Sequence, residues 1–301
     1  MRRNLLSIND LSKRDVLYIF KRADKLRKGS NKVVRFDPSK VAGLLFFEDS
    51  LRTRIGFEVA AWRLGIKSVK INGTKITKNM GRAESIRDTI RALDPYVSFF
   101  CVRHSDENIF AEVTPFTKQP VINCGNGNLE HPTQALIDAY TIWTRFNNID
   151  GLTVTMVGNL KYSRSAHSLA LLLAKFNNVT VKTYAPHELA LENKYKATFS
   201  KNGNTVIDIQ HPEWGNEQVI YSVGFPRNNP NGKFPLARSK KYRITKSDVA
   251  KMASDSILLN PLPRIDEIDQ EVDELPNAHY FTQNELGLYV RMAIIEKYFL
   301  S

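Results

Sequence analysis

The sequence contains only two cysteines in 301 residues, Cys101 and Cys124. Both lie in apolar, strand-like runs without the spacing of metal ligands, so the sequence predicts buried free thiols. Long apolar runs are also missing, and no stretch approaches the roughly 20 residues that a membrane-spanning helix requires. The apolar segment after residues 1–4 is too short for a secretory signal. These absences lead us to expect a cytoplasmic protein.

A continuous run of basic residues is absent too, although the chain as a whole is basic. Lysine and arginine number 43 against 31 aspartates and glutamates, which gives a formal net charge of +12. The basic residues are spread along the chain and do not alternate with aromatic residues, as they do in single-strand nucleic-acid binders. A basic field also attracts small anionic substrates. We therefore expect a small-molecule partner and no nucleic acid.

What the sequence does contain is an alternation of short strands and helices. Apolar runs expected to form strands lie at residues 41–47, 68–71, 97–102, 120–123, 152–157, 179–184, 206–209, 219–223 and 257–259. Helical patterns lie at residues 11–27, 54–64, 85–93, 131–146, 165–176 and 283–299. The alternation predicts the α/β class with doubly wound parallel sheets, and the length fits two domains. We place the domains at 1–146 and 147–283, with residues 284–301 packing back on the first.

The turn at residues 50–53 lies between the first predicted strand and a helix expected to begin near Arg54. Free N–H groups at a helix N-terminus, the hydroxyls of Ser50 and Thr53 and the guanidinium of Arg52 converge on this turn. Such a set of donors is typical of an anion-binding site. The ordinary alternative is a capped helix whose arginines lie in solvent.

Further polar side chains follow other predicted strand ends. Arg103 follows the third strand, and His131 and Gln134 open the helix after the fourth. In parallel sheets ligands bind outside the carboxyl ends of the strands, so one pocket can collect these side chains together with the turn at 50–53. Taken singly, a histidine of this kind is more often structural, and an arginine more often a surface charge.

Two polar segments interrupt the pattern of strands and helices. Residues 72–83 contain glycines and basic residues, and we expect a mobile basic loop there. Residues 225–241 are rich in Pro, Asn, Gly and basic residues. Because unstructured connections of that length are uncommon in compact domains, the second segment is predicted to be a long functional loop or lid.

Taken together, these residues resemble the aspartate/ornithine carbamoyltransferase family, and within it the catalytic chain of the aspartate branch. The matching motifs are Phe47-Glu48-x-Ser50-x-Arg52-Thr53-Arg54-x-x-Phe57-Glu58, Glu84-Ser85-x-x-Asp88-Thr89, Arg103-His104, His131-Pro132-Thr133-Gln134-Ala135-Leu136-x-Asp138, Lys161-Tyr162-x-Arg164-x-x-His167-Ser168 and Pro261-Leu262-Pro263-Arg264-x-Asp266-Glu267. They occur in the family's order over nearly the whole chain. Pro-Leu-Pro-Arg favours the aspartate branch, because ornithine enzymes typically carry His-Cys-Leu-Pro there.

The resemblance implies two α/β domains bridged by helices, a homotrimer with active sites at subunit interfaces, and no cofactor or metal. The reaction it implies moves the carbamoyl group of carbamoyl phosphate to an amino acid, aspartate by default, as in pyrimidine biosynthesis. Residues implied to bind carbamoyl phosphate are Ser50, Leu51 through its backbone, Arg52, Thr53, Arg103, His131 and Gln134, with Lys78 and Arg82 supplied by a neighbouring subunit. Those implied to act on the reacting atoms are Arg52, Thr53, Arg103 and His131.

Acceptor binding is implied for Arg164 and for the backbone around Pro261 and Leu262. Aspartate enzymes usually add an Arg-x-Gln motif, but counting without gaps places Gly224 and Pro226 at its two side chains. The loss of that arginine removes a bidentate carboxylate clamp. Either Arg227 or Lys233 is available to replace it.

Other departures affect the phosphate side of the implied site. Leu51 replaces the family's first threonine in Ser-Thr-Arg-Thr-Arg, which removes one hydroxyl near the phosphate. Lys78 stands where the neighbouring subunit's loop carries a serine, so that loop is altered, unless it is an ordinary solvated loop. The departures keep two alternatives open besides aspartate transfer: another amine acceptor, or a non-catalytic relative that binds a phosphorylated metabolite or a partner chain. Regulatory chains also remain open, and nucleic-acid binding is the least supported alternative.

Overall fold

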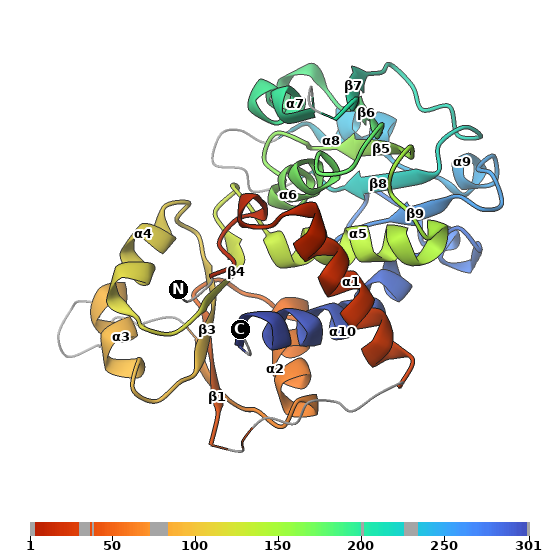
Figure 1. Cartoon of the computed structure of the whole chain (residues 1–301). Coiled ribbons are helices and arrows are strands. Elements are labelled where there is room, and N and C mark those ends of the chain that lie inside the picture. Colours follow the sequence, from red (N-terminus) through yellow and green to blue (C-terminus); the bar gives the residue numbers. More distant parts are fainter. Residues whose placement is uncertain are drawn as a thin grey trace. The chain divides into compact units, whose positions relative to one another are not determined.

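A computed structural model describes residues 4–29, 37, 39–72, 84–199, 202–225 and 234–299 (Figure 1). The chain divides into two compact units: unit 1 comprises Met1–Leu136 with Leu286–Ser301, and unit 2 comprises Ile137–Glu285. It passes from unit 1 to unit 2 within helix α5 (Pro132–Phe146) and returns within α10 (Tyr280–Phe299). No helix among the described residues has the length and apolarity needed to cross a bilayer.

Unit 1 is built on a parallel sheet with the strand order β2-β1-β3-β4. The strands are β1 (Val41–Phe46), β2 (Lys67–Asn72), β3 (Phe99–His104) and β4 (Val121–Asn126). The helices within it are α1 (Lys13–Arg27), α2 (Arg52–Arg63), α3 (Ile86–Leu93) and the short α4 (Ile109–Val113), with 3-10 turns η1 (Ile8–Asp10) and η2 (Thr114–Phe116). Because the strand order reverses direction between β1 and β3, ligands are expected at their carboxyl ends.

Unit 2 holds a second parallel sheet with the order β7-β6-β5-β8-β9. The strands are β5 (Thr153–Gly158), β6 (Thr180–Tyr184), β7 (Thr205–Asp208), β8 (Val219–Val223) and β9 (Ile257–Leu259). The helical elements are α6 (Arg164–Leu173), α7 (Asn193–Phe199), α8 (Leu236–Ser239), α9 (Lys246–Val249), η3 (His187–Leu189), η4 (Lys240–Tyr242) and η5 (Gln270–Glu274). The order reverses between β5 and β8, which is the corresponding ligand position in this unit.

The apolar patterns in the sequence produce these elements for ordinary reasons. Most of β1, β4, β5 and β8 is buried, as expected for parallel strands with both faces covered. The first helix begins at a complete capping box, in which the Ser12 hydroxyl accepts from the Asp15 N–H and the Asp15 carboxylate accepts from the Ser12 N–H. The two sheets confirm the predicted α/β class, and both cysteines are buried and free, as predicted.

The structure corrects two predictions about individual elements and adds one element that was not predicted. Helix α2 begins at Arg52 and not near Arg54, because the polar residues of the turn already adopt helical backbone angles. The short helix α4 was not predicted, since five residues are too few to show a helical period. The prediction of one unstructured segment over 225–241 is wrong at its far end, where α8 and η4 form, and residues 226–233 lie outside the described residues. Most of the loop predicted at 72–83 also lies outside them.

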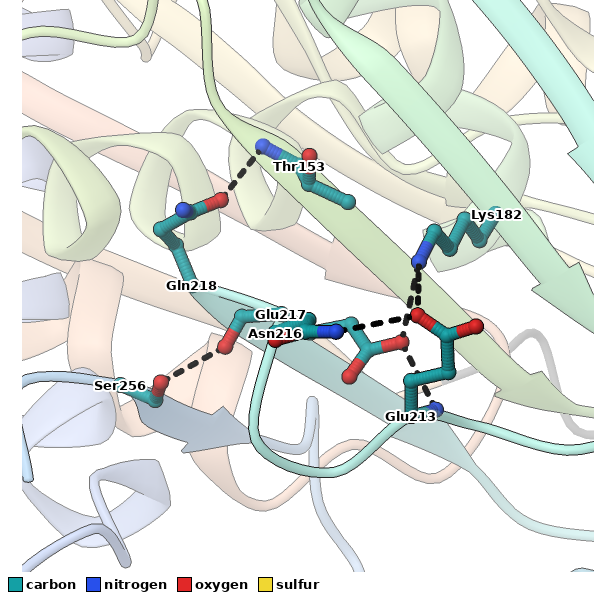
Figure 2. A network of polar contacts seen from close by, with 7 residues as sticks. All are labelled: Thr153, Lys182, Glu213, Asn216, Glu217, Gln218 and Ser256. Carbon is teal, nitrogen blue, oxygen red and sulfur yellow. Dashed lines mark hydrogen bonds and ion pairs between the residues drawn. The ribbon is translucent and has the colours of Figure 1, made fainter. Parts of the chain in front are cut away.

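A polar network connects neighbouring segments at the amino end of the unit 2 sheet, and Figure 2 shows its members. We call it the amino-end network, and it consists of Thr153, Lys182, Glu213, Asn216, Glu217, Gln218 and Ser256. The Gln218 side chain accepts from the Thr153 N–H at 2.9 Å, and Ser256 donates to the Glu217 carbonyl at 2.6 Å. The segment before β8 is thereby fastened to the starts of β5 and β9.

The charged core of the amino-end network is the Glu217 carboxylate, whose side chain is fully buried. It accepts from the Glu213 N–H at 3.0 Å and lies 3.4 Å from Lys182 Nζ, on β6. Lys182 also lies 3.6 Å from the Glu213 carboxylate. The ammonium is therefore placed between two carboxylates, as buried charges require for compensation.

Candidate active site

The turn after β1 leads directly into the N-terminus of α2. Leu51 is the N-cap residue, it is 63% exposed, and its side chain makes no capping hydrogen bond. Its backbone lies in the right-handed helical region, at φ −75° and ψ −64°. The N–H groups of the first turn therefore gain no side-chain acceptor from the cap residue, while the helix dipole makes this end positive. Both features favour an anion at the turn.

Arg52 is the first residue of α2, and its side chain is half-buried. Burial lowers the pKa of its guanidinium below the ordinary value, although it stays charged at neutral pH. It forms no hydrogen bond or ion pair with any residue of the described ranges. Removing a cation from water without a compensating anion is costly, so this position is best explained by a bound anion.

Arg103 reaches the same edge of the sheet from β3. It pairs with Phe46 in the register of β1 and β3, and its carbonyl accepts from the Phe47 N–H at 2.9 Å. Its Nε lies 3.2 Å from a carboxylate oxygen of Glu48, an ion pair without hydrogen-bond alignment. Glu48 therefore holds the guanidinium electrostatically beside the turn that follows β1.

His131 connects the start of α5 with the first turn of α2. Its Nε2 lies 3.4 Å from the Thr53 hydroxyl, and its Nδ1 lies 3.3 Å from the Thr133 hydroxyl. All three side chains are buried. Because each hydroxyl can donate or accept, the tautomer of His131 is coupled to the orientation of both hydroxyls.

The structure thus places the unit 1 candidates around the carboxyl ends of β1 and β3. Gln134 joins them, because its N–H donates to the His131 carbonyl at 3.0 Å and its side chain is 9% exposed. Ser50 is half-buried in the turn before Leu51. Lys78 and Arg82 lie outside the described residues, so the structure does not place them.

Unit 2 carries its own group of candidates at the carboxyl end of its sheet. Arg164 is the first residue of α6, whose N-cap Ser163 accepts from the Ala166 N–H at 3.2 Å. Pro261 and Leu262 follow β9, and Leu262 has a positive φ of 52°. A positive φ is costly for a branched residue, and residues held in such strained backbone conformations cluster at functional sites.

Asn260 holds the Pro261-Leu262 backbone in place, a role that we did not predict from the sequence. Its side-chain oxygen accepts from the Leu262 N–H at 2.7 Å. Its amide donates to the Ser222 carbonyl at 3.1 Å and to Glu267 at 2.9 Å. The signal in the sequence was an amide residue directly after an apolar strand, which by itself is common at strand ends.

A buried chain of hydrogen bonds through Gln283 and Asp138 holds Asn260 in place. The Asn260 N–H donates to the Gln283 side chain at 3.1 Å, and the Gln283 amide donates to Asp138 at 2.6 Å. The Tyr221 hydroxyl donates to the other Asp138 oxygen at 2.8 Å. Burial, followed by the negative charge of Asp138, raises the pKa of Tyr221 far above its ordinary value, so the phenol keeps its proton.

Gly224 lies directly after β8, at the position where the aspartate branch of the family that this sequence resembles carries an arginine. A Cβ atom at this position would lie 3.1 Å from the carboxylate atoms of Glu267. Glu267 is buried and accepts from the N–H groups of Ile265 and Asp266 at 3.0 and 3.1 Å. The carboxylate therefore occupies space that any larger residue at 224 would need. Pro226 and Arg227 lie outside the described residues.

Known proteins match this chain over nearly its full length. The family model "Aspartate/ornithine carbamoyltransferase, carbamoyl-P binding domain" matches residues 3–144, and the "Asp/Orn binding domain" model matches residues 150–297. An aspartate carbamoyltransferase catalytic subunit of Picrophilus torridus is 35% identical, over 97% of this chain and 96% of the relative. The catalytic subunit of Methanocaldococcus jannaschii is 32% identical, over 98% and 97%.

Solved structures give the same result. Aspartate transcarbamoylase of Trypanosoma cruzi in complex with carbamoyl phosphate superimposes with a TM-score of 0.89 at 29% identity, covering 98% of this chain and 95% of that one. The same enzyme has been solved with carbamoyl aspartate and phosphate, and with N-(phosphonacetyl)-L-aspartic acid. The M. jannaschii catalytic subunit has a TM-score of 0.86 at 32% identity, covering 99% and 97%.

Proposed function

Because this chain belongs to the aspartate/ornithine carbamoyltransferase family, we propose that it transfers the carbamoyl group of carbamoyl phosphate to the amino group of aspartate. The products are N-carbamoyl-aspartate and phosphate, and the reaction belongs to pyrimidine biosynthesis. The observation that carries the proposal is the half-buried Arg52 at the uncapped N-terminus of α2, without an acidic partner among the described residues. Family membership confirms the resemblance drawn from the sequence motifs.

In this proposal the turn at 50–53 binds the phosphate. Arg52 supplies a guanidinium fork, Ser50 and Thr53 supply hydroxyls, and Leu51 and its neighbours supply N–H groups at the positive helix end. Neutralising the phosphate before the reaction makes it a better leaving group. The absence of a hydroxyl at Leu51 weakens phosphate binding but leaves the backbone donors in place.

The carbamoyl group lies between Thr53, Arg103 and His131, with Gln134 holding its amide. The unprotonated amine attacks the carbonyl carbon, and negative charge develops on the carbonyl oxygen. Donors aimed at that oxygen stabilise the tetrahedral intermediate. The C–O bond to phosphate then breaks, and the departing phosphate accepts the proton that the amine loses. No nucleophilic side chain is required, since holding two substrates in place supplies much of the rate enhancement.

The acceptor is assigned to unit 2, where Arg164 and the Pro261-Leu262 backbone orient its carboxylates. This gives residues 1–146 with 284–301 the role of carbamoyl-phosphate domain and residues 147–283 that of acceptor domain. Arg227 replaces part of the clamp lost at Gly224. A different amine acceptor is the alternative within this function, and the Glu267 carboxylate beside Gly224 is the observation that favours it.

We also propose a cytoplasmic homotrimer in which Lys78 and Arg82 of one subunit enter the neighbour's site. An exposed apolar stripe on α2 supports the assembly: Leu51, Ile55 and Trp62 are 63%, 44% and 59% exposed and follow helical spacing. Val69 on the edge strand β2 is 42% exposed. Exposed apolar patches of this kind mark interaction surfaces. Sedimentation of the full chain tests the trimer.

The function is tested by carbamoyl-phosphate-dependent phosphate release across a panel of amino acids and other amines. We expect turnover with aspartate, and turnover with another amine alone would transfer the proposal to that acceptor. Absence of acceptor-dependent turnover at every concentration would reject catalysis and favour a non-catalytic binding protein. Binding of N-(phosphonacetyl)-L-aspartic acid then tests the phosphate and acceptor half-sites together, because tight binding requires both. If the protein binds phosphonates without carboxylates but does not bind this compound, the acceptor half-site has changed.

A further inference from the structure

Asp138, on α5, is a fully buried carboxylate to which the proposed reaction gives no task. The Tyr221 hydroxyl donates to one of its oxygens at 2.8 Å, and the Gln283 amide donates to the other at 2.6 Å. Taking a carboxylate out of water is costly, and well-packed apolar residues of similar volume are often at least as stable. Stability alone is therefore a weak explanation for a carboxylate at this position.

The first oxygen of Asp138 leads to the helix start that carries Arg164. Burial and the charge of Asp138 raise the pKa of Tyr221, and a hydrogen bond from the Ser165 side chain opposes them. Because that bond favours the phenolate, Ser165 donates and the Tyr221 oxygen accepts. Ser165 is buried and directly follows Arg164 in the first turn of α6. Asp138 and the start of α6 are therefore joined through one phenol.

The second oxygen of Asp138 leads to Leu262. The Gln283 side-chain oxygen accepts from the Asn260 N–H at 3.1 Å, and the Asn260 side-chain oxygen accepts from the Leu262 N–H at 2.7 Å. Leu262 lies between two prolines, which have no N–H, so its amide is the single backbone donor of residues 261–263. Its positive φ is a conformation that persists only when surrounding contacts hold it.

The charge of Asp138 sets the direction of both chains of hydrogen bonds. An ionised carboxylate accepts hydrogen bonds and donates none. Gln283 must therefore present its NH₂ group to Asp138, which leaves its oxygen for the Asn260 N–H. Tyr221 must present its O–H, which leaves its oxygen for Ser165. Buried hydrogen bonds aligned in this way polarise and strengthen one another.

We infer that Asp138 is a positioning residue that fixes the two acceptor-binding elements relative to each other. These elements are the start of α6 with Arg164 and the Pro261-Leu262 backbone, which lie far apart in the sequence. The inference rests on the proposed function, which assigns the acceptor to them. Every residue of the two chains belongs to unit 2, so the effect of Asp138 is confined to the acceptor side.

Asp138→Asn tests the inference, because it keeps the shape and replaces one acceptor with a donor. We expect kcat/KM for aspartate to fall about tenfold, as for the loss of one buried hydrogen bond. The affinity for N-(phosphonacetyl)-L-aspartic acid should fall by a similar factor, whereas the affinity for carbamoyl phosphate alone should not change. Phosphate release measures the first quantity, and calorimetry measures both affinities. A role in overall stability alone would not separate the two ligands.

Glu217→Gln is the matched control. It also neutralises a fully buried carboxylate of unit 2, but in the amino-end network at the opposite end of the sheet. We expect it to leave kcat/KM for aspartate and both affinities unchanged.

The two chains are separated by single variants. Tyr221→Phe interrupts only the chain to Ser165, and Gln283→Met interrupts only the chain to Leu262. Each should lower kcat/KM for aspartate, and each should cost less in the Asp138→Asn background than alone, because the residues act as one network. Hydrogen exchange followed by mass spectrometry on peptides covering residues 257–266 needs no substrate. Exchange at the Leu262 amide should accelerate in Asp138→Asn and Gln283→Met and stay unchanged in Tyr221→Phe.

Three results would each overturn the inference. These are equal losses of affinity for N-(phosphonacetyl)-L-aspartic acid and carbamoyl phosphate in Asp138→Asn, the same loss of aspartate activity in Glu217→Gln, and unchanged exchange at Leu262 in Asp138→Asn. If Asp138→Asn fails to fold, Tyr221→Phe and Gln283→Met provide the same tests. Wild-type protein that turns over no acceptor would reject the proposed function, whereas the exchange measurement tests Asp138 without turnover.

Discussion

At the start of α2, the half-buried Arg52 has no acidic partner among the described residues, whereas Lys182 of the amino-end network lies between two carboxylates. Both regions lie at ends of parallel strands. In the proposed function a ligand completes the charge balance at the carboxyl end of the unit 1 sheet, whereas the charges at the amino end of the unit 2 sheet compensate one another. An uncompensated charge therefore indicates function, and a compensated one indicates stability.

The largest expected effect comes from Arg52→Ala, which removes the uncompensated charge. We expect carbamoyl phosphate affinity to fall by about 3–5 kcal/mol, the loss of a bidentate charge-assisted contact, with the free energy of unfolding nearly unchanged. Isothermal titration calorimetry measures the affinity and urea denaturation the stability. Arg63→Ala, at the exposed end of α2, is the control. An unchanged affinity in Arg52→Ala would refute its role at the phosphate.

Glu217→Ala is the converse change in the amino-end network. It leaves Lys182 facing Glu213 alone and removes the acceptor of the partly buried Glu213 N–H, so we expect the free energy of unfolding to fall by about 2 kcal/mol. Carbamoyl phosphate affinity should not change. Urea denaturation checks the first expectation and calorimetry the second. Glu213→Ala, which removes the more exposed carboxylate, should cost less; an equal cost would contradict the importance of burial.

Leu51→Thr sharpens the comparison by restoring a hydroxyl to the open turn. We expect carbamoyl phosphate affinity to rise by about 1 kcal/mol through one new hydrogen bond to a charged oxygen. The melting temperature without ligand should hardly change, because N-cap side chains bond the helix from extended backbone angles and residue 51 is in the helical region. Leu51→Val, similar in shape to threonine, is the control. A large gain in ligand-free stability would show that the hydroxyl caps the helix.

The smallest expected effect is an acid dependence of unit 2 stability. The hydrogen bond from Arg264, near the Pro261-Leu262 backbone, lowers the pKa of the Asp273 carboxyl in the folded state. A lowered folded-state pKa adds stability above the unfolded pKa of about 3.9, and this stability is lost as the pH falls through the folded value. We expect Asp273→Asn to remove that part of the acid dependence while neutral stability drops by less than about 1 kcal/mol. Urea midpoints between pH 7 and 3 measure it, and identical pH profiles would contradict it.

The sequence predicted the α/β class and most strands because hydrophobic periodicity is local. Runs such as residues 97–102 need both faces buried and are recognisable without knowledge of their neighbours. The predicted element boundaries were wrong where local signals are weak. At α2, for example, the polar residues Arg52 and Thr53 already lie in the helix. Helices as short as α4 and α8 carry no period from which they can be predicted.

Motifs in the sequence determined the family and the types of residue available to the site, since phosphate recognition requires particular donors in a particular order. Only the tertiary structure decided which charges are compensated. The sequence alone does not show that the charge of Lys182 is compensated and that of Arg52 is not, because the partners of both side chains depend on which strand ends meet in space. The same holds for Glu267 beside Gly224, since the two residues come from segments distant in the chain. Charge compensation is a long-range property, and long-range contacts follow from the order of strands in the sheets.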